Sequence, residues 1–446
     1  MQEMILLGAG ASVEAGVPDT VGMTERIVDI FAKDQTLSKY SHVLRFAVGG
    51  LLFQKGVKGE NPFSGVNIED VFNAIQILSD RHNLEAAPFM GSWHPLVEEL
   101  DVIRTGGGFN ALRALRSNMG SSWINSHEID RAVEDMLQGR RSSRSLGNVI
   151  SDAIRNSQPR QSRSIFGGPA PSEPRERPGE GQIFEQTNDQ MIRKLVDLVW
   201  IEDQTKVAHL GPLLSSHDQA VLVVATLNYD NAFELAGQAA GVTVETGIGA
   251  ITDTGRFPTI EKGVYLLKLH GSIDWSLQDI SPSPEKPLAS QAIQKVSTEV
   301  MRTSGYRPAL IFGQRNKLTA KGPFLDILAV FREQLTKAER LTVIGYSFRD
   351  EHVNEYIGQW LNADRIRKLR IINGEKFAPA PGEFAYQLLQ LPGRVELIPS
   401  IASVGIRDCF SQTKLAIQTE PPVAPSESAF EKTQIPSHDV LKAPVN

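Results

Sequence analysis

The stretch from Met4 to Ser12 constrains the fold of this chain more than any other part of its sequence. Four apolar residues, ending at Leu7, break directly into a Gly-Ala-Gly-Ala-Ser turn, and a helix-compatible stretch begins at Thr24. A short strand that ends in a glycine-rich turn can present backbone N–H groups to a pyrophosphate. A G-x-G-x-x-G fingerprint would carry a third glycine where this chain has Val13. The turn therefore indicates either a nucleotide-binding loop or an ordinary strand-to-helix connection.

Five further apolar runs have the length and composition of strands that are buried on both faces. They cover residues 221–226, 264–269, 309–312, 341–344 and 369–372. Helical patterns separate several of these runs: Pro323 suits a first helical position, and apolar stripes continue over residues 324–335 and 353–361. Strands that alternate with helices predict an α/β fold with a doubly wound, Rossmann-like, mostly parallel sheet.

The segment between the first strand and residue 221 contains no strand-like run. Asn67 suits the N-cap of a helix with acidic residues in its first turn, and further helices are expected over residues 129–137 and 191–199. We therefore expect an all-α module inserted into the sheet domain. This division gives a Rossmann-like NAD-binding domain at residues 1–40 and 216–380, a helical insertion at 41–215, and a C-terminal extension with a Pro-rich tail at 381–446.

Composition excludes several classes of protein. The chain has 46 basic and 52 acidic residues, so its formal net charge of −6 gives no overall attraction to nucleic acid. Cys409 is the single cysteine, which excludes an internal disulfide and a Cys-rich zinc site and fits a reducing compartment. No stretch approaches the ~20 apolar residues that cross a bilayer. We therefore expect a cytoplasmic protein that does not associate with membranes.

The insertion contains one segment of unusual composition. Residues 157–182 are rich in Pro, Gly, Ser and Arg, and eight arginines lie between Arg140 and Arg177. This composition is typical of a solvated loop or a disordered segment. It leaves open a docking surface or contact with nucleic acid, either at this segment or indirectly through a partner.

Polar residues come directly after four of the later strands and supply the case for a site. In a doubly wound sheet the ligand crevice lies outside the carboxyl ends of the strands, so such residues face a ligand. Each has an alternative structural role: Asn228 or Ser347 could cap a helix, His270 could be a satisfied turn histidine, and Asp19 could belong to a turn. The convergence of several strand ends with the glycine turn favours a single crevice.

The set as a whole resembles the sirtuin family, and in particular its bacterial branch associated with antiphage defence. The matching motifs are Gly8–Ser12 with Gly16–Asp19, Thr226–Asp230, Lys268–Gly271, Gly345–Ser347 and Asn373. The resemblance implies that the chain binds NAD in the crevice; no metal is expected, because the chain has only one cysteine. It implies that the pyrophosphate is held by Gly8, Ala9, Gly10 and Ser12, and that the adenosine half lies along Gly345, Ser347 and Asn373.

The resemblance also implies roles for the catalytic end of the site. Asp19 would face the nicotinamide amide, and Asn228 would hold the nicotinamide ribose or a water beside it. His270 would act as acid and base on a ribose hydroxyl, and Asp230 would support Asn228. An amide can orient water without charge, and an imidazole can titrate near neutrality.

Departures from the family pattern shape the expected activity. Sirtuin deacylases carry a four-cysteine zinc ribbon after the His-Gly pair, which a chain with one cysteine lacks. The Phe-Arg pair that usually follows the Pro-Asp pair is Thr20-Val21 here, and the residue before Asn228 is Leu227 instead of the usual Gln. Water is therefore the expected acceptor, and the expected protein is an NAD glycohydrolase that releases nicotinamide and ADP-ribose and depletes NAD during infection. A non-catalytic sensor of NAD or ADP-ribose and a zinc-less protein deacylase remain alternatives.

Unrestrained hydrolysis of NAD would be lethal, so we expect the activity to be gated. The gate could be homo-oligomeric assembly, a partner, or the helical insertion covering the site. The chain has no G-x-x-x-x-G-K-[ST] loop, so an ATP-driven step would need another protein. The resemblance implies a HerA-like ATPase as a possible partner.

Overall fold

The computed structural model describes residues 2–81, 83–84, 97, 100, 182–215, 221–250, most of 258–311, and 323–411. Three predictions fall outside the described residues: the helix at 129–137, the Arg-rich loop up to residue 181, and the Pro-rich tail. Within the described part of the chain, no helix combines the length and apolar character that spanning a bilayer requires.

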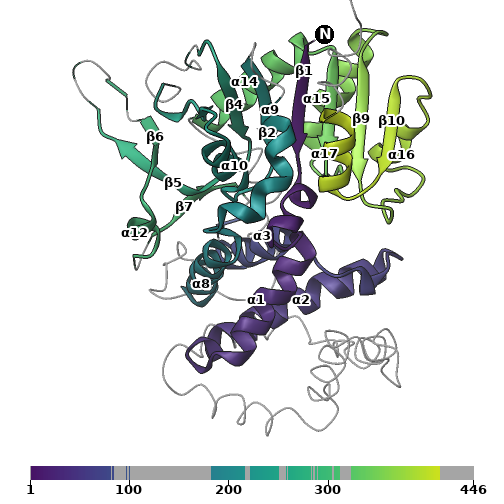
Figure 1. Ribbon diagram of the computed structural model, residues 1–446. Coiled ribbons are helices and arrows are strands. Elements are labelled where there is room, and N and C mark those ends of the chain that lie inside the picture. Colours follow the sequence, from purple (N-terminus) through teal and green to yellow (C-terminus); the bar gives the residue numbers. More distant parts are fainter. Residues whose placement is uncertain are drawn as a thin grey trace, which may run out of the picture.

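A seven-stranded sheet forms the centre of the molecule, and every strand pair in it is parallel (Figure 1). The strand order is β10-β9-β8-β1-β2-β4-β3. The strands are β1 (Glu3–Leu7), β2 (Val221–Thr226), β3 (Val244–Glu245), β4 (Gly263–Lys268), β8 (Arg340–Ile344), β9 (Lys368–Asn373) and β10 (Val395–Pro399). Helices pack on both faces, which confirms the predicted doubly wound α/β fold.

Strand β1 explains why the sheet has a hydrophobic core on each side. Its alternating residues separate cleanly: Ile5 and Leu7 belong to one core and Met4 and Leu6 to the other, and all four are almost fully buried. Helices α14 (Pro323–Lys337), α15 (Glu351–Ala363) and α16 (Phe384–Leu389) pack into the second core. The first core receives α10 (Ala232–Ala240), α9 (Gly211–Ser215), the 3-10 helix η7 (Gln204–Leu210) and α17 (Ala402–Phe410).

The helical region lies beyond the carboxyl ends of the central strands (Figure 1). Its described helices include α1 (Thr20–Lys33), α2 (Ser38–Val57), α3 (Ile68–Ser79) and α8 (Gln182–Val199), which pack on one another. The described part of residues 41–215 contains no strand. Asn67 caps α3 as predicted, because its side-chain oxygen accepts the Glu69 N–H at 2.9 Å. Helix α1 packs with this group although its residues were assigned to the sheet domain.

The chain departs from the expected elements after His270. The run at 309–312 was predicted to join the parallel sheet, and this is wrong: β7 (Pro308–Leu310) pairs antiparallel with β5 (Gly271–Ile280), which also pairs with β6 (Ser290–Lys295). A short apolar run carries no information about which sheet it joins. Gly271 makes the change of direction with φ of +85°, and a Cβ there would lie 2.0 Å from the Ala309 carbonyl oxygen.

The main sheet also continues past residue 380. Strand β10 forms its edge beside β9, and α17 comes after β10 and packs against the sheet. Both elements lie in the range that the sequence assigned to a C-terminal extension.

Candidate functional site

The ends of the central strands are level with one another, and this brings the predicted residues to one edge. Leu7 pairs with Thr226 on one side and Ile344 on the other, and Thr226 pairs with Lys268. Because β1 lies between β2 and β8 in the middle of the sheet, the crevice falls at the switch point where nucleotides bind in such folds. Asn228 and His270 each lie two residues past the end of their strand.

The glycine turn and Gly345 pack backbone to backbone. The N–H groups of Gly8 and Gly10 donate to the carbonyls of Ile344 and Gly345 at 2.9 and 2.8 Å. A Cβ at Gly8 would lie 2.6 Å from the Gly345 oxygen, and one at Gly10 would lie 2.7 Å from the Gly345 Cα. The glycines thus allow a close approach of two backbones, and in this structure the approaching group is the β8 loop.

The turn continues along its own backbone and uses some of its amides for internal hydrogen bonds. It continues as two short 3-10 turns, Ala9–Ala11 and Val13–Ala15, so the α1 N-terminus at Thr20 does not follow it directly. The N–H groups of Ala11 and Ser12 donate to carbonyls within the turn. The roles of Gly8, Ala9, Gly10 and Ser12 in holding a pyrophosphate therefore stay predictions.

Asn228 is held by the glycine turn rather than serving as a helix cap. Its Nδ2 donates to the Gly8 carbonyl and to Ser12 Oγ, both at 3.0 Å. Its Oδ1 makes no hydrogen bond within the described residues. The Ser12 hydroxyl in turn bonds the carboxylate of Asp230, whose Oδ1 also accepts the Ala232 N–H at 3.0 Å. The amide of Asn228 is therefore fixed with its oxygen as the acceptor that remains.

Burial raises the pKa of the Asp230 carboxyl, and Lys268, the Ala232 amide and Ser12 oppose that shift. Lys268 is itself fully buried, and its Nζ donates to the Asp230 carbonyl and to Glu234 Oε1 at 2.8 Å. Burial disfavours the Lys268 ammonium, but the carboxylates of Glu234, Asp274 and Asp230 outweigh it and raise the pKa of Lys268. A charged lysine thus lies under the strand ends.

His270 is buried, with an exposed fraction of 5%, and lies between two carboxylates. Its Nε2 is 2.7 Å from Asp350 Oδ2, and its Nδ1 is 3.9 Å from Glu69 Oε1. Among the residues that the structure describes, Nδ1 has no hydrogen-bond partner. Within the described residues one of the two ring nitrogens has no hydrogen-bond partner, which does not fit the alternative of a satisfied turn histidine.

Glu69 reaches the site from the helical region, at the first turn of α3. The Tyr229 hydroxyl donates to Glu69 Oε1 at 2.7 Å, and the centroids of the Tyr229 and His270 rings lie 6.2 Å apart. Burial, followed by the neighbouring Glu69 charge, raises the pKa of Tyr229 well above its usual value, which keeps it a donor. Sequence reasoning assigned Glu69 only to the first turn of a helix and did not connect it with His270.

Three predicted ligand residues have structural roles or lie at the rim. Asp19 is exposed and caps α1, where its carboxylate accepts the Gly22 N–H at 2.7 Å. The Asn373 side chain donates to the Tyr346 carbonyl at 2.9 Å and accepts the Gly374 N–H at 3.0 Å, which ties the β8 and β9 loops together. Ser347 is exposed and does not cap α15, because Asp350 does. Their contacts with NAD stay predictions.

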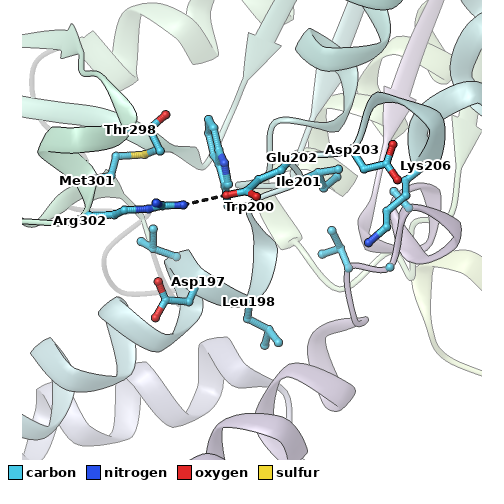
Figure 2. Close-up of a pocket in the computed structure, with 14 residues that line it drawn as sticks. Asp197, Leu198, Trp200, Ile201, Glu202, Asp203, Lys206, Thr298, Met301 and Arg302 are labelled. Carbon is cyan, nitrogen blue, oxygen red and sulfur yellow. Dashed lines mark hydrogen bonds and ion pairs between the residues drawn. The ribbon is translucent and has the colours of Figure 1, made fainter.

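Two cavities lie near the glycine turn. A cavity of about 10 Å³ borders Ser12, Asn228 and Asp230, and its volume is enough for about one water molecule. A cleft of about 420 Å³ lies between the end of α8, η7 and the short helix α12 (Thr298–Met301). Figure 2 shows Arg302 directed across this cleft to Glu202, with which it forms an ion pair at 2.7 Å. The cleft touches the turn only at residues 15–17 and includes none of the predicted catalytic side chains.

In a comparison with protein families, the model of a SIR2-like domain matches residues 222–385. This range runs from β2 to α16 and contains Asn228, Asp230, His270, Gly345, Ser347 and Asn373. No curated protein matches the chain significantly. The family match supports the sirtuin-like assignment of this region, and SIR2-like domains bind NAD.

The polar groups at the strand ends include two acceptors that could bind the hydroxyls of a ribose. His270 Nδ1, which has no partner in the described part of the chain, can accept a hydrogen bond from a hydroxyl, and Asn228 Oδ1 can accept from a water or a second hydroxyl. In the turn, the N–H groups of Gly8, Gly10, Ala11 and Ser12 already donate to carbonyls of the protein.

Proposed function

We propose that this chain is an NAD glycohydrolase that cleaves NAD⁺ to nicotinamide and ADP-ribose. The observation that carries the proposal is the buried His270 ring beside the strand ends of a SIR2-like region: Nε2 is anchored, and Nδ1 has no hydrogen-bond partner among the described residues. A nucleotide sugar is the ligand that this family binds at such an edge, and a free imidazole nitrogen is the group that its ribose hydroxyls would need.

The reaction needs little more than positioning and a base. The bond between nicotinamide and the ribose breaks, nicotinamide leaves with the electron pair, and water adds to the anomeric carbon and releases a proton. The transition state has oxocarbenium character, as in glycoside cleavage. In our proposal His270 accepts a ribose hydroxyl proton as positive charge develops on the sugar, and Asn228 orients the ribose or the attacking water.

Hydrolysis is favoured over protein deacylation because of the segment after the His-Gly pair. In this chain the segment forms the small antiparallel sheet β6-β5-β7 and contains no cysteine. A zinc ribbon of the kind that sirtuin deacylases carry therefore has no cysteine ligands here. We propose water as the acceptor on this ground.

We further propose that the activity is gated and serves antiphage defence by depletion of NAD. Support for a gate comes from α3, whose Glu69 accepts from Tyr229 and lies 3.9 Å from His270 Nδ1. A movement of the helical region would alter the surroundings of the base. Assembly into a homo-oligomer, or binding of a HerA-like ATPase, is our proposal for what drives that movement.

The test is nicotinamide release, measured by chromatography, together with fluorescence from etheno-NAD. His270→Ala and Asn228→Ala should each lower the rate by about 10²–10⁴, as loss of a positioned acid/base group does. His42→Ala, which changes an exposed histidine of α2, is the matched control and should leave the rate unchanged. Turnover by both site variants at the parent rate would overturn the assignment.

Calorimetry distinguishes the competing functions. Binding of NAD or ADP-ribose with no turnover, also in the presence of a partner, would support a sensor. An acetylated peptide that is deacylated in an NAD-dependent reaction would support the zinc-less deacylase.

A further inference from the structure

Asp350 lies between β8 and α15, and its two carboxylate oxygens have different partners. Oδ1 accepts the N–H groups of His352 and Val353 at 3.0 and 3.2 Å, which caps α15. Oδ2 lies 2.7 Å from Nε2 of His270. Helix capping requires only the first of these contacts, so the second needs an explanation of its own.

We infer that Asp350 is a positioning residue, which fixes the His270 ring and its tautomer for the proposed reaction. An ionised carboxylate can only accept, so the ring nitrogen that faces Asp350 carries the hydrogen. In the neutral imidazole the other nitrogen, Nδ1, is then the acceptor. This is the nitrogen that lacks a hydrogen-bond partner within the described residues. The inference rests on the proposed function for its meaning, but the tautomer can be measured without turnover.

The loop before α15 holds Asp350 firmly in place. The Asp350 N–H donates to the Tyr346 hydroxyl at 2.9 Å, and Asn354 Nδ2 donates to the Phe348 carbonyl at 2.7 Å. Asp350, Tyr346 and Asn354 are all buried.

The backbone conformation of Phe348 is a second indication that the loop before α15 is under a functional constraint. It has a φ of +57°, the one positive φ of a non-glycine residue within the described part of the chain. Its ring packs on Tyr346, with the ring centroids 4.8 Å apart. Backbone strain of this kind persists where surrounding contacts over-determine it, and it clusters at active sites. Here the strained turn aims Asp350 at His270.

Asp350→Asn separates the positioning role from the capping role. The amide oxygen of asparagine can still accept from the start of α15, since asparagine is as good an N-cap as aspartate. The amide NH₂ that replaces Oδ2 is a donor, so it cannot accept from Nε2–H. The ring must then move its hydrogen to Nδ1, and Nδ1 no longer serves as a base.

The experiment uses the full chain labelled with ¹⁵N-histidine. Imidazole ¹⁵N shifts report which nitrogen carries the hydrogen, and His270→Ala identifies the signal. We expect the parent to show a protonated Nε2 and a bare Nδ1, and Asp350→Asn to show the reverse. Nicotinamide release by Asp350→Asn should fall by about 10²–10⁴ in kcat, with little change in KM.

Asp34→Asn is the matched control. Asp34 caps the 3-10 helix η3 (Gln35–Leu37), where its carboxylate accepts the Thr36 N–H at 2.9 Å and the Thr36 hydroxyl at 2.6 Å. The same substitution at this partly exposed cap should change neither the histidine signals nor turnover.

The outcomes separate the two proposals. An unchanged tautomer in Asp350→Asn, or a parent ring that carries both hydrogens at neutral pH, would overturn the positioning role. A switched tautomer in a protein whose parent form never releases nicotinamide would uphold the positioning role and refute the glycohydrolase. If Asp350→Asn released nicotinamide at the parent rate, the glycohydrolase assignment would stand, and Asp350 would have no positioning role in the reaction.

Discussion

Gly345→Ala tests whether the loops after β1 and β8 pack as tightly as the structure has them. Gly345 has a φ of +65°, a conformation that costs an L-residue about 1–2 kcal/mol. An added Cβ would lie 2.3 Å from the Ala11 nitrogen and 2.4 Å from the Gly10 carbonyl carbon. Ordinary contact begins near 3.4 Å, so one backbone must move by about 1 Å.

The expected loss of stability combines both effects. Overpacking of a tight site costs about 1–3 kcal/mol, so the free energy of unfolding should fall by about 2–5 kcal/mol in total. Urea denaturation followed by circular dichroism measures this loss as a lower midpoint at unchanged slope.

Gly50→Ala is the control of opposite sign. Gly50 lies in α2 with no heavy atom within 4 Å of an added Cβ, so alanine should stabilise the helix by about 0.5–1 kcal/mol. If Gly345→Ala matched the parent in stability to within about 0.5 kcal/mol, the backbone contact between the two loops would be refuted.

Two further substitutions test the surroundings of the site. Lys268→Met leaves the buried carboxylates beside it without their cation and should lower the free energy of unfolding by about 3–5 kcal/mol. Its control is Lys337→Met, which breaks an exposed i,i+4 pair and should lower the free energy of unfolding by less than about 1 kcal/mol. Equal losses in the two variants would contradict the buried pair. Glu69→Gln weakens a charged hydrogen bond from Tyr229, worth about 1.5–3 kcal/mol, and should raise NAD turnover by up to about tenfold if α3 restrains the site. Lower turnover in Glu69→Gln, measured as nicotinamide release, would contradict a restraining role.

Local sequence patterns were sufficient to predict the parallel sheet. Each buried strand is a short continuous apolar run, and the helices between them carry periodic apolar faces, so the α/β class can be read from residues that are close in sequence. Strand β10 was missed because Glu396 interrupts its apolar run and it lies at the sheet edge. The β5-β7 sheet was missed because a strand with five buried and then several exposed residues has no single period.

The candidate site was predictable only in part, for a different reason. Asn228 and His270 were singled out because each comes just after a strand, and the level ends of β2 and β4 place both at one edge. Glu69 and Asp350 contact His270 across separations of about 200 and 80 residues, and locally each looks like an ordinary first-turn or capping residue of a helix. Nothing near them in the sequence signals a partner so distant.

The glycine turn shows how one local requirement can have two causes. The sequence requires a backbone without side chains at Gly8 and Gly10, which a pyrophosphate or another backbone could equally explain. The structure shows Gly345 in contact with both glycines, and the binding of a pyrophosphate by the turn stays a prediction.

The most direct test of the proposed function is to incubate the purified full chain with NAD⁺ and to measure free nicotinamide and ADP-ribose by chromatography, with calorimetric binding in parallel. We predict equal amounts of both products from the parent and a rate lower by about 10²–10⁴ from His270→Ala, which should still bind NAD⁺. Binding without any product, or products at the same rate from both proteins, would contradict the proposed function.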